Sequence, residues 1–431
     1  MNKFTKSLSI YFLPVLGLIF YSCIDAPVSP DGNRITGALY GKHDKLSVNL
    51  YSDYFISIGN APLYLIEGTP EFSLNSFTVP YDLVINEFYG NLIYKYEGIK
   101  INNTKPLFLD PHAPESPDWL GYSDFVVRLP VSKHIRTFYL KVISEDKFYQ
   151  QNYKYVIGPG DTLVGVWFHY PDITRKFSGK IMFLQEEVTE EHMLEFPKYG
   201  IKSLDEVAFD RIEFTESDIS YDPQEVTRTF RNSVPEGSYD YRSIVSLTFG
   251  GHDNGSDMNI YEGIRNGMEF TMPLLHLNDL RYKYIGGYQT GAYMGYASKE
   301  VVLNPGDEVN IIHKAPPAII SPEDNAVNIY GNDVFKINDD NQQGVYIYEF
   351  VVLRNFGVYK HLKYYTTKKE LKFSDITCRG FEMQPNSTYY WWVYKLPGFQ
   401  DIDKLLAVHY LKDSRYNDLE LSQVRSFTTG P

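Results

Sequence analysis

MQPNSTYYWWVY, residues 383–394, is the stretch of this sequence that decides the fold. It opens with turn residues, and the aromatic and β-branched run that follows them is typical of a β-strand. Alternation along a strand places on one face Tyr389, Trp391 and Val393. It places on the other face Tyr390, Trp392 and Tyr394. One tryptophan of the adjacent pair is therefore predicted to enter a core, and the other to face outward or toward another domain.

The residues around this strand resemble two steps of a fibronectin type III domain. In that family a Leu-x-Pro-x-Thr-x-Tyr step leads into the sixth strand, and Ser-Phe-Thr-Thr often closes the seventh. The first step is occupied here by Met383, Pro385, Ser387 and Tyr389, and the second by residues 426–429. The resemblance implies a β-sandwich, with Tyr389 as a tyrosine corner whose hydroxyl bonds back to the backbone.

This last block departs from the family pattern in two places. Its second strand, VFKIN, offers Phe335 and Ile337 where a tryptophan is usual. Between the sixth and seventh strands lies an insertion, residues 396–423, in which the apolar spacing from Ile402 to His409 predicts a short helix. An insertion of this kind either adds a binding function or covers a sheet edge.

Short apolar runs separated by Gly, Pro, Asn and Asp continue through the rest of the chain, which predicts antiparallel strands. We therefore expect an all-β fold of serial antiparallel β-sandwich domains, immunoglobulin-like or fibronectin III-like, with minor helical insertions. Pro-rich segments at 109–119 and 315–326 mark two of the boundaries. The predicted β-domains are residues 35–110, 111–210, 211–315 and 316–431. Whether residues 35–210 form one domain or two stays open.

The first block is similar to the carboxypeptidase regulatory-like β-domain. The residues that carry this similarity are Gly37, Gly68, Phe77, Pro80, Tyr81 and Asp82. The resemblance implies an accessory sandwich and brings no catalytic residue with it. Phe77–Pro80 is echoed by Phe270–Pro273, for which tandem duplication and chance are equal alternatives. In the second block the acidic segment Glu186–Phe209 predicts one or two short helices.

Composition supports a large β-rich core and argues against binding of nucleic acid. The chain of 431 residues holds 37 tyrosines and 27 phenylalanines, and aromatic side chains suit half-buried pleated surfaces. Its formal net charge is -13, and the best basic run, Lys363 to Lys369, is short. Nucleic-acid binding needs clustered Lys and Arg against phosphates, so we expect no nucleic-acid partner.

The opening stretch MNKFTKSLSIYFLPVLGLIFYSC predicts the cellular location of the protein. Lys3 and Lys6 precede an apolar run that ends just before Cys23 and is shorter than the roughly 20 residues of a membrane span. The stretch resembles a bacterial lipoprotein signal of the Bacteroidetes type. The resemblance implies removal of residues 1–22, lipidation of Cys23 with palmitate-type chains, and a tether at 23–34 from the outer membrane. The alternative is an ordinary cleaved signal in which Cys23 is incidental.

The sequence carries no motif for catalysis, a cofactor or a metal. It lacks His-Glu-x-x-His, Gly-x-Ser-x-Gly and a phosphate-binding Gly-rich loop. The oxygen-rich loops at 250–257 and 338–341 are interpreted as turns and not as calcium sites. Sugar-binding sandwiches stack pyranose rings on Trp and Tyr, so a ligand or partner surface is the remaining possibility. Its candidate residues are Trp392, Trp391 and Tyr390.

We therefore expect a lipid-anchored cell-envelope protein that acts as a non-enzymatic binding or scaffold module. Its partner would be a glycan or an envelope protein, at either the periplasmic or the surface face of the membrane. The alternative is an accessory or degenerate enzyme of polysaccharide or peptide processing, with converging acids or histidines between Trp119 and Phe209. A purely structural spacer is a third hypothesis. The sandwich fold cannot choose among them, because it hosts many functions.

Overall fold

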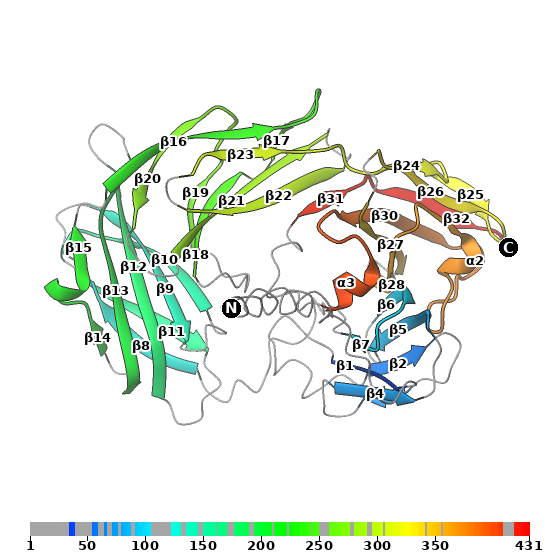
Figure 1. Ribbon diagram of the computed structural model, residues 1–431, viewed down its shortest axis with the longest axis horizontal. Coiled ribbons are helices and arrows are strands. Elements are labelled where there is room, and N and C mark those ends of the chain that lie inside the picture. Colours follow the sequence, from blue (N-terminus) through cyan, green and yellow to red (C-terminus); the bar gives the residue numbers. More distant parts are fainter. Residues whose placement is uncertain are drawn as a thin grey trace, which may run out of the picture.

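Strands make up almost all the regular structure of this chain, which confirms the all-β fold class. Figure 1 shows the computed structural model, in which the strands form an open arch. The described residues are 34–38, 54–58, 64–66, 71–75, 79–87, 91–104, 122–129, 131, 135–144, 150–160, 162–169, 176–188, 194–208, 211–221, 224–241, 243–249, 258–275, 280–290, 295–304, 307–340, 343–354, 357–407 and 418–431. Among them no helix has the length and apolar character needed to cross a membrane.

The first two blocks are built of short strands and one long hairpin. The first block holds β1 (Arg34–Ala38), β2 (Tyr54–Ile58), β3 (Tyr64–Ile66), β4 (Glu71–Asn75), β5 (Tyr81–Glu87), β6 (Leu92–Ile99) and β7 (Asn103–Thr104). The second holds β8 (Tyr122–Arg128), β9 (Arg136–Ser144), β10 (Gln150–Ile157), β11 (Leu163–His169), β12 (Lys176–Val188), β13 (Leu194–Ala208), β14 (Arg211–Glu213), η1 (Glu216–Asp218) and β15 (Ile219–Tyr221). Strands β14 and β15 follow the predicted boundary after residue 210, yet they pair with β8 and β13, so the second block extends to Tyr221.

The last two blocks hold the remaining strands and two short helices. The third block holds β16 (Gln224–Ser233), β17 (Tyr239–Asp240), β18 (Ile244–Phe249), β19 (Met258–Glu262), β20 (Glu269–Leu274), β21 (Leu280–Gln289), β22 (Tyr296–Leu303) and β23 (Val309–Ile312). The fourth holds β24 (Ala318–Ser321), β25 (Ala326–Ile329), β26 (Val334–Asn338), β27 (Val345–Arg354), β28 (Gly357–Thr366), β29 (Glu370–Lys372), α2 (Phe373–Ile376), β30 (Thr388–Leu396), α3 (Ile402–Ala407), β31 (Leu419–Leu421) and β32 (Arg425–Thr429).

Three small sheets, one in each of the first three blocks, share the same connectivity. In each sheet the first strand of the block lies in the middle, antiparallel to one partner and parallel to the last or, in the second block, the second-last strand. The sheets are β4-β1-β7, β11-β8-β14 and β20-β16-β23. A repeated unit would produce this pattern, so the shared connectivity favours tandem duplication over chance.

A 15-stranded sheet joins three of the four blocks, so these three blocks are not structurally independent domains. Strand β28 of the fourth block pairs in parallel with β6 of the first. Strand β31 pairs on one side with β30 of its own block and on the other with β22 of the third block. The blocks therefore lie in the spatial order first, fourth, third, and the right half of the arch in Figure 1 contains both ends of the described chain.

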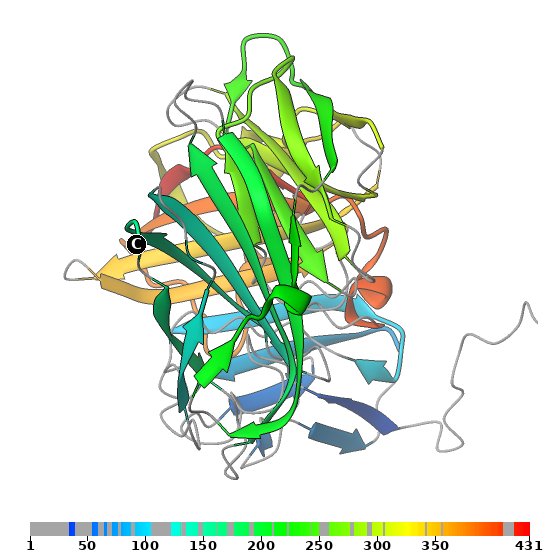
Figure 2. The same ribbon diagram turned by 90° about the vertical axis from the view of Figure 1, so that its left-hand side faces the viewer.

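The helices predicted in Glu186–Phe209 are wrong where the structure describes this region, because residues 186–188 and 194–208 are strand. Strands β12 and β13 form a long antiparallel hairpin, which Figure 2 shows as two adjacent green strands. Alternate side chains of β12 enter two different cores: Met182 and Leu184 enter one, and Ile181 and Phe183 the other. Burial on both faces of a strand outweighs the local helix preference of the glutamates, since propensity is a weak bias that tertiary packing overrides.

The fourth block is a sandwich whose core confirms the alternation predicted for β30. Trp391 has no exposed surface and packs edge-on against Phe335, with ring centroids 5.0 Å apart. Phe335 of β26 is itself fully buried in this core. The hydroxyl of Tyr389 accepts a hydrogen bond from the backbone N–H of Gln384 at 2.9 Å, as expected for a tyrosine corner.

The helix predicted in the insertion is present as α3. Its apolar residues Ile402, Leu405 and Leu406 are buried in the core that the fourth block shares with the first. His409, the last residue of the predicted helix, lies outside the described residues. The helix therefore covers the face of the sheet that continues from β27 and β28 into β6, and the part of the insertion that the structure describes acts as a cover.

Candidate functional site

The outward face of β30 carries two of the three predicted surface residues. The side chain of Tyr390 is 39% exposed, and Trp392 is partly buried on the same face. Trp391 is not part of this surface, because alternation sends it into the core, and its inclusion as a surface residue was wrong. We call Tyr390 and Trp392 the aromatic strip. A sheet strand fixes their backbone, so the two rings are held by a rigid element.

A row of charged side chains lies beside the aromatic strip. Glu349 of β27 is directly opposite Trp392 on one side and opposite Lys363 of β28 on the other. Its carboxylate is 2.8 Å from Nε2 of His361 and 3.1 Å from Nζ of Lys363. The ring of His361 lies 6.1 Å from that of Trp392, centroid to centroid. We call Glu349, His361 and Lys363 the charged row.

Glu349 is ionised although it is buried. Burial raises the pKa of its carboxyl, but the hydrogen bond from His361 and the charge of Lys363 outweigh burial, so the net pKa lies below the usual value. The side chain of Glu349 is 5% exposed, whereas those of His361 and Lys363 are 21% and 18% exposed. The two donors therefore reach the surface, and the carboxylate beneath them fixes their positions.

Together the strip and the row offer aromatic faces next to hydrogen-bond donors. Such a combination suits a sugar, whose ring stacks on an aromatic face while its hydroxyls bind charged groups. Sequence analysis found the strip but missed the row. The signal was present in GVYIYEFVVL, where a single glutamate interrupts an apolar strand, and such a residue is buried only when it has partners.

Other predicted features carry no chemistry in the described part of the chain. Cys23 lies outside the described residues, as do residues 250–257. Among the residues that are described, no group of His, Cys, Asp and Glu could hold a metal ion. Cys378 packs against the core of the fourth block, and burial raises the pKa of its thiol to about 11, which keeps it protonated and unreactive.

The enzyme hypothesis requires an acidic cleft in the second block, and a cavity found among the described residues of that block is not acidic. A cavity of about 360 Å³ between β10 and β11 is lined by the segments 155–158, 160 and 162–164, which contain neither a carboxylate nor an imidazole. Glu186 lies on β12 and accepts a hydrogen bond from the hydroxyl of Tyr139. Burial raises the pKa of Tyr139, and this hydrogen bond raises it further.

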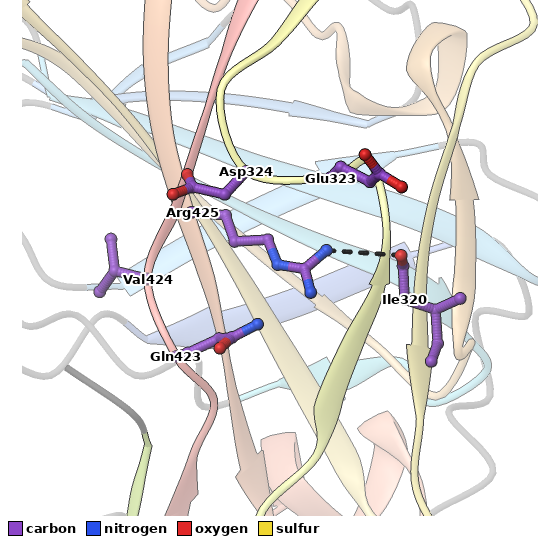
Figure 3. Close-up of a pocket in the computed structure, with 6 residues that line it drawn as sticks. All are labelled: Ile320, Glu323, Asp324, Gln423, Val424 and Arg425. Atoms are coloured by element: carbon purple, nitrogen blue, oxygen red, sulfur yellow. Dashed lines mark hydrogen bonds between the residues drawn. The ribbon is translucent and has the colours of Figure 1, made fainter. Parts of the chain in front are cut away.

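A small pocket beside β32 has a structural explanation. Figure 3 shows Arg425 extending from this strand toward the backbone of β24. Its guanidinium donates to the carbonyl oxygens of Pro322 and Ile319, both at 2.8 Å, and to that of Ile320 at 3.4 Å. A guanidinium used in this way ties two strands together, so we assign Arg425 a structural role.

Comparisons with known proteins do not identify a family. No family model matches the chain, and no curated protein matches it. A solved tetra-tandem repeat from the extending region of a large adhesion protein has 7% sequence identity and a TM-score of 0.15, with 92% of this chain and 98% of that chain covered. The native conformation of E. coli alpha-2-macroglobulin has 10% identity and a TM-score of 0.13, with 92% and 28% covered. Likenesses this low carry no argument about function.

Proposed function

We propose that this protein is a lipid-anchored envelope protein that binds a glycan at the aromatic strip and does not transform it. The observation that carries the proposal is that the exposed Tyr390 and the partly buried Trp392 lie on one face of a strand beside the charged row. In this proposal a sugar ring stacks on Trp392, and its hydroxyls bind His361 and Lys363. An aromatic ring with a large contact area contributes strongly when it is the centre of an interface.

A glycan array with the full chain purified in detergent tests the binding proposal. Trp392→Ala should weaken binding at least about tenfold, because it removes the stacking surface. Tyr330→Ala is the matched control, since this tyrosine is 61% exposed and follows β25, away from the strip. Glycan binding that survives Trp392→Ala would refute the strip as the site. Absence of binding by the wild type would instead favour an envelope protein as partner.

The anchor is proposed from the similarity of residues 1–23 to lipoprotein signals. Replacing the lipidated cysteine should move the protein from the membrane fraction to the soluble fraction of the cell envelope. The test is therefore Cys23→Ala, compared with Cys378→Ala, which leaves the anchor in place. Immunoblots of the separated fractions read out the result. Membrane association that persists in Cys23→Ala would remove the basis for proposing that a lipid on Cys23 anchors the protein to the outer membrane.

A further inference from the structure

A cavity lies where the third and fourth blocks meet, on the opposite face of β30 from the aromatic strip. It has a volume of about 610 Å³, which is within the range of small-molecule sites. One side comes from β22 and the residues after β23, and the other from β30, β31 and the turn after β30. We call this space the junction cavity. The charged and titratable residues of its lining are Lys299, His313, Lys314, Lys395, Asp418 and Glu420.

The floor of the junction cavity, which we define as the sheet face of β22, β31 and β30, carries neighbouring charges of opposite sign. Glu420 of β31 is directly opposite Lys395 of β30. On the other side of β31, the pairing with β22 ends one residue short of Lys299 and Asp418, so these two residues lie next to each other. The carboxylate of Asp418 accepts a hydrogen bond from the backbone N–H of Glu300 at 2.9 Å, which holds it at this place. Each ammonium group of the floor therefore has a carboxylate on the neighbouring strand.

The charges around the junction cavity balance by geometry. Nζ of Lys395 lies 2.7 Å from a carboxylate oxygen of Asp339, which stands behind the lining, and 3.4 Å from a carboxylate oxygen of Glu420. When Asp339 is counted with the lining, the three lysines are matched by three carboxylates. A ligand that carries a net charge of either sign would therefore leave one charge of the site without a counter-charge.

The third-block side of the junction cavity offers donors to a ligand. No described residue accepts a hydrogen bond from Nζ of Lys299 or of Lys314, although both residues line the cavity. The hydroxyl of Tyr288 donates to the backbone carbonyl of Lys314, so the chain after β23 is held in place. Two ammonium groups thus extend from fixed backbone next to the carboxylates of the floor.

The imidazole of His313 is also held in one orientation. Its Nε2 lies 2.7 Å from the side-chain oxygen of Asn232. The amide nitrogen of Asn232 donates to the carboxylate of Asp240 and to the carbonyl oxygen of Gly287, both at 3.1 Å. The oxygen of this amide is therefore the group that faces the ring, so Nε2 is the donor and Nδ1 is left for a ligand.

We propose that the junction cavity binds a small neutral molecule that is rich in hydroxyl groups, such as a monosaccharide. A hydroxyl group can accept a hydrogen bond from an ammonium group and donate one to the carboxylate beside it. Lys299 and Asp418 form such a pair, and hydrogen bonds to charged groups are stronger than those between neutral groups. An acidic sugar would bring its carboxylate next to Asp418 and Glu420. A zwitterion would place each of its charges beside a like charge of the floor.

This site is separate from the aromatic strip and goes beyond the proposed glycan binding there. Its two sides belong to blocks that are linked in the sheet by the pairing of β22 with β31. A ligand that contacts both sides stabilises the paired arrangement, because it binds only when the two sides are together. Binding should therefore also raise the unfolding temperature of the full chain.

Calorimetric titration of the full chain in detergent tests the proposal with matched pairs of ligands. D-glucose is compared with D-glucuronate and D-galactose with D-galacturonate, because the members of each pair differ only in the carboxylate. The titration is made at pH 8, above the pKa of about 7 to which burial raises that of Glu420, so that this carboxyl is ionised. We expect saturable binding of at least one neutral sugar, and binding of its uronate weaker by about tenfold or more.

Variants of the floor and of the third-block side locate the binding. Lys299→Met and Lys314→Met should each weaken binding of the neutral sugar about tenfold, because each removes a charged donor. Lys336→Met is the matched control, since this lysine pairs with Glu370 at the surface of β26. Asp418→Asn removes one negative charge and keeps an oxygen for the N–H of Glu300, so the discrimination against the uronate should fall about tenfold.

Trp392→Ala separates this site from the strip. Binding of the neutral sugar should be unchanged in this variant, whatever happens to glycan binding, and its loss would place the sugar on the strip and overturn the proposal. Absence of saturable binding by both neutral sugars would also overturn it. So would a uronate that binds as tightly as its neutral sugar, or unchanged affinity in both lysine variants.

Discussion

Replacing Glu420 by glutamine should change how the stability of the protein depends on pH. Glu420 lies in β31, the strand that connects the third and fourth blocks, and it is 7% exposed. Glutamine has nearly the same shape as a protonated glutamate but cannot ionise. The pKa of Glu420 is affected by the charges of Lys395 of β30, Asp339 after β26 and Lys314 after β23. The charge of Glu420 in turn raises the pKa of Tyr288 of β21 and of Tyr346 of β27.

The expected magnitude follows from the pKa of Glu420. Burial raises this pKa from 4.5 to about 7, with Asp339 adding to the rise and Lys395 and Lys314 opposing it. A group whose pKa is higher in the folded state stabilises the fold fully below its unfolded pKa and loses that effect as the pH rises through its folded pKa. Between about pH 4.5 and 7, the wild type should therefore lose about 3 kcal/mol relative to Glu420→Gln.

The wild type must be compared with Glu420→Gln, because the titration of His313 changes the stability with pH in the opposite direction. Burial lowers its pKa from 6.5 to about 4, so its contribution is present above pH 6.5 and is lost as the pH falls toward 4. The two effects largely cancel in the wild type. The difference in free energy of unfolding between wild type and Glu420→Gln, measured by urea denaturation across this range, isolates Glu420. A difference that stays constant with pH, or a wild type that gains stability relative to Glu420→Gln as the pH rises, would refute the reasoning.

Two further substitutions test the packing of the fourth block. Tyr389→Phe removes the acceptor of the partly buried hydrogen bond from the N–H of Gln384 and should cost about 1 kcal/mol, whereas Tyr390→Phe on the exposed face should change stability by less than about 0.5 kcal/mol. Equal effects in urea denaturation would contradict a tyrosine corner. Lys395→Met leaves the carboxylate of Asp339 without its buried counter-ion and should cost about 3 to 5 kcal/mol, against at most about 1 kcal/mol for Lys336→Met at the surface. A thermal shift for Lys395→Met no larger than for Lys336→Met would count against the buried pair.

Local patterns predicted the parts of this fold that depend on local geometry. The two-residue period of a strand predicted that one of Trp391 and Trp392 enters a core while the other faces outward, and the structure places Trp391 inward. The step into β30 predicted the hydrogen bond of Tyr389, because a corner is made by residues close together in sequence. At Gly160, which follows Pro159 in the sequence, φ is +82°, the positive value that favours glycine at the third position of a turn.

Asp339 shows why the charged sites could not be predicted. In sequence it lies in a polar stretch, Asn338 to Asn341, and was interpreted as part of an exposed turn. In the structure it is 6% exposed and pairs with Lys395. The carboxylate is buried only because a strand distant in sequence brings an ammonium group to it. Glu349 differs from Asp339, because its partners His361 and Lys363 lie on β28, the next strand in the sequence.

The sequence by itself determined that this chain is all-β, that the two tryptophans of β30 point to opposite faces, and that the hydroxyl of Tyr389 bonds back to the backbone. These properties follow from side-chain alternation and turn chemistry, which act over a few residues. Only the tertiary structure decided that β6 joins β28, that β31 joins β22 to β30, and that Glu186 lies on a strand. Pairing between distant strands depends on which faces and edges can be buried together, and a short window of sequence does not contain the partner.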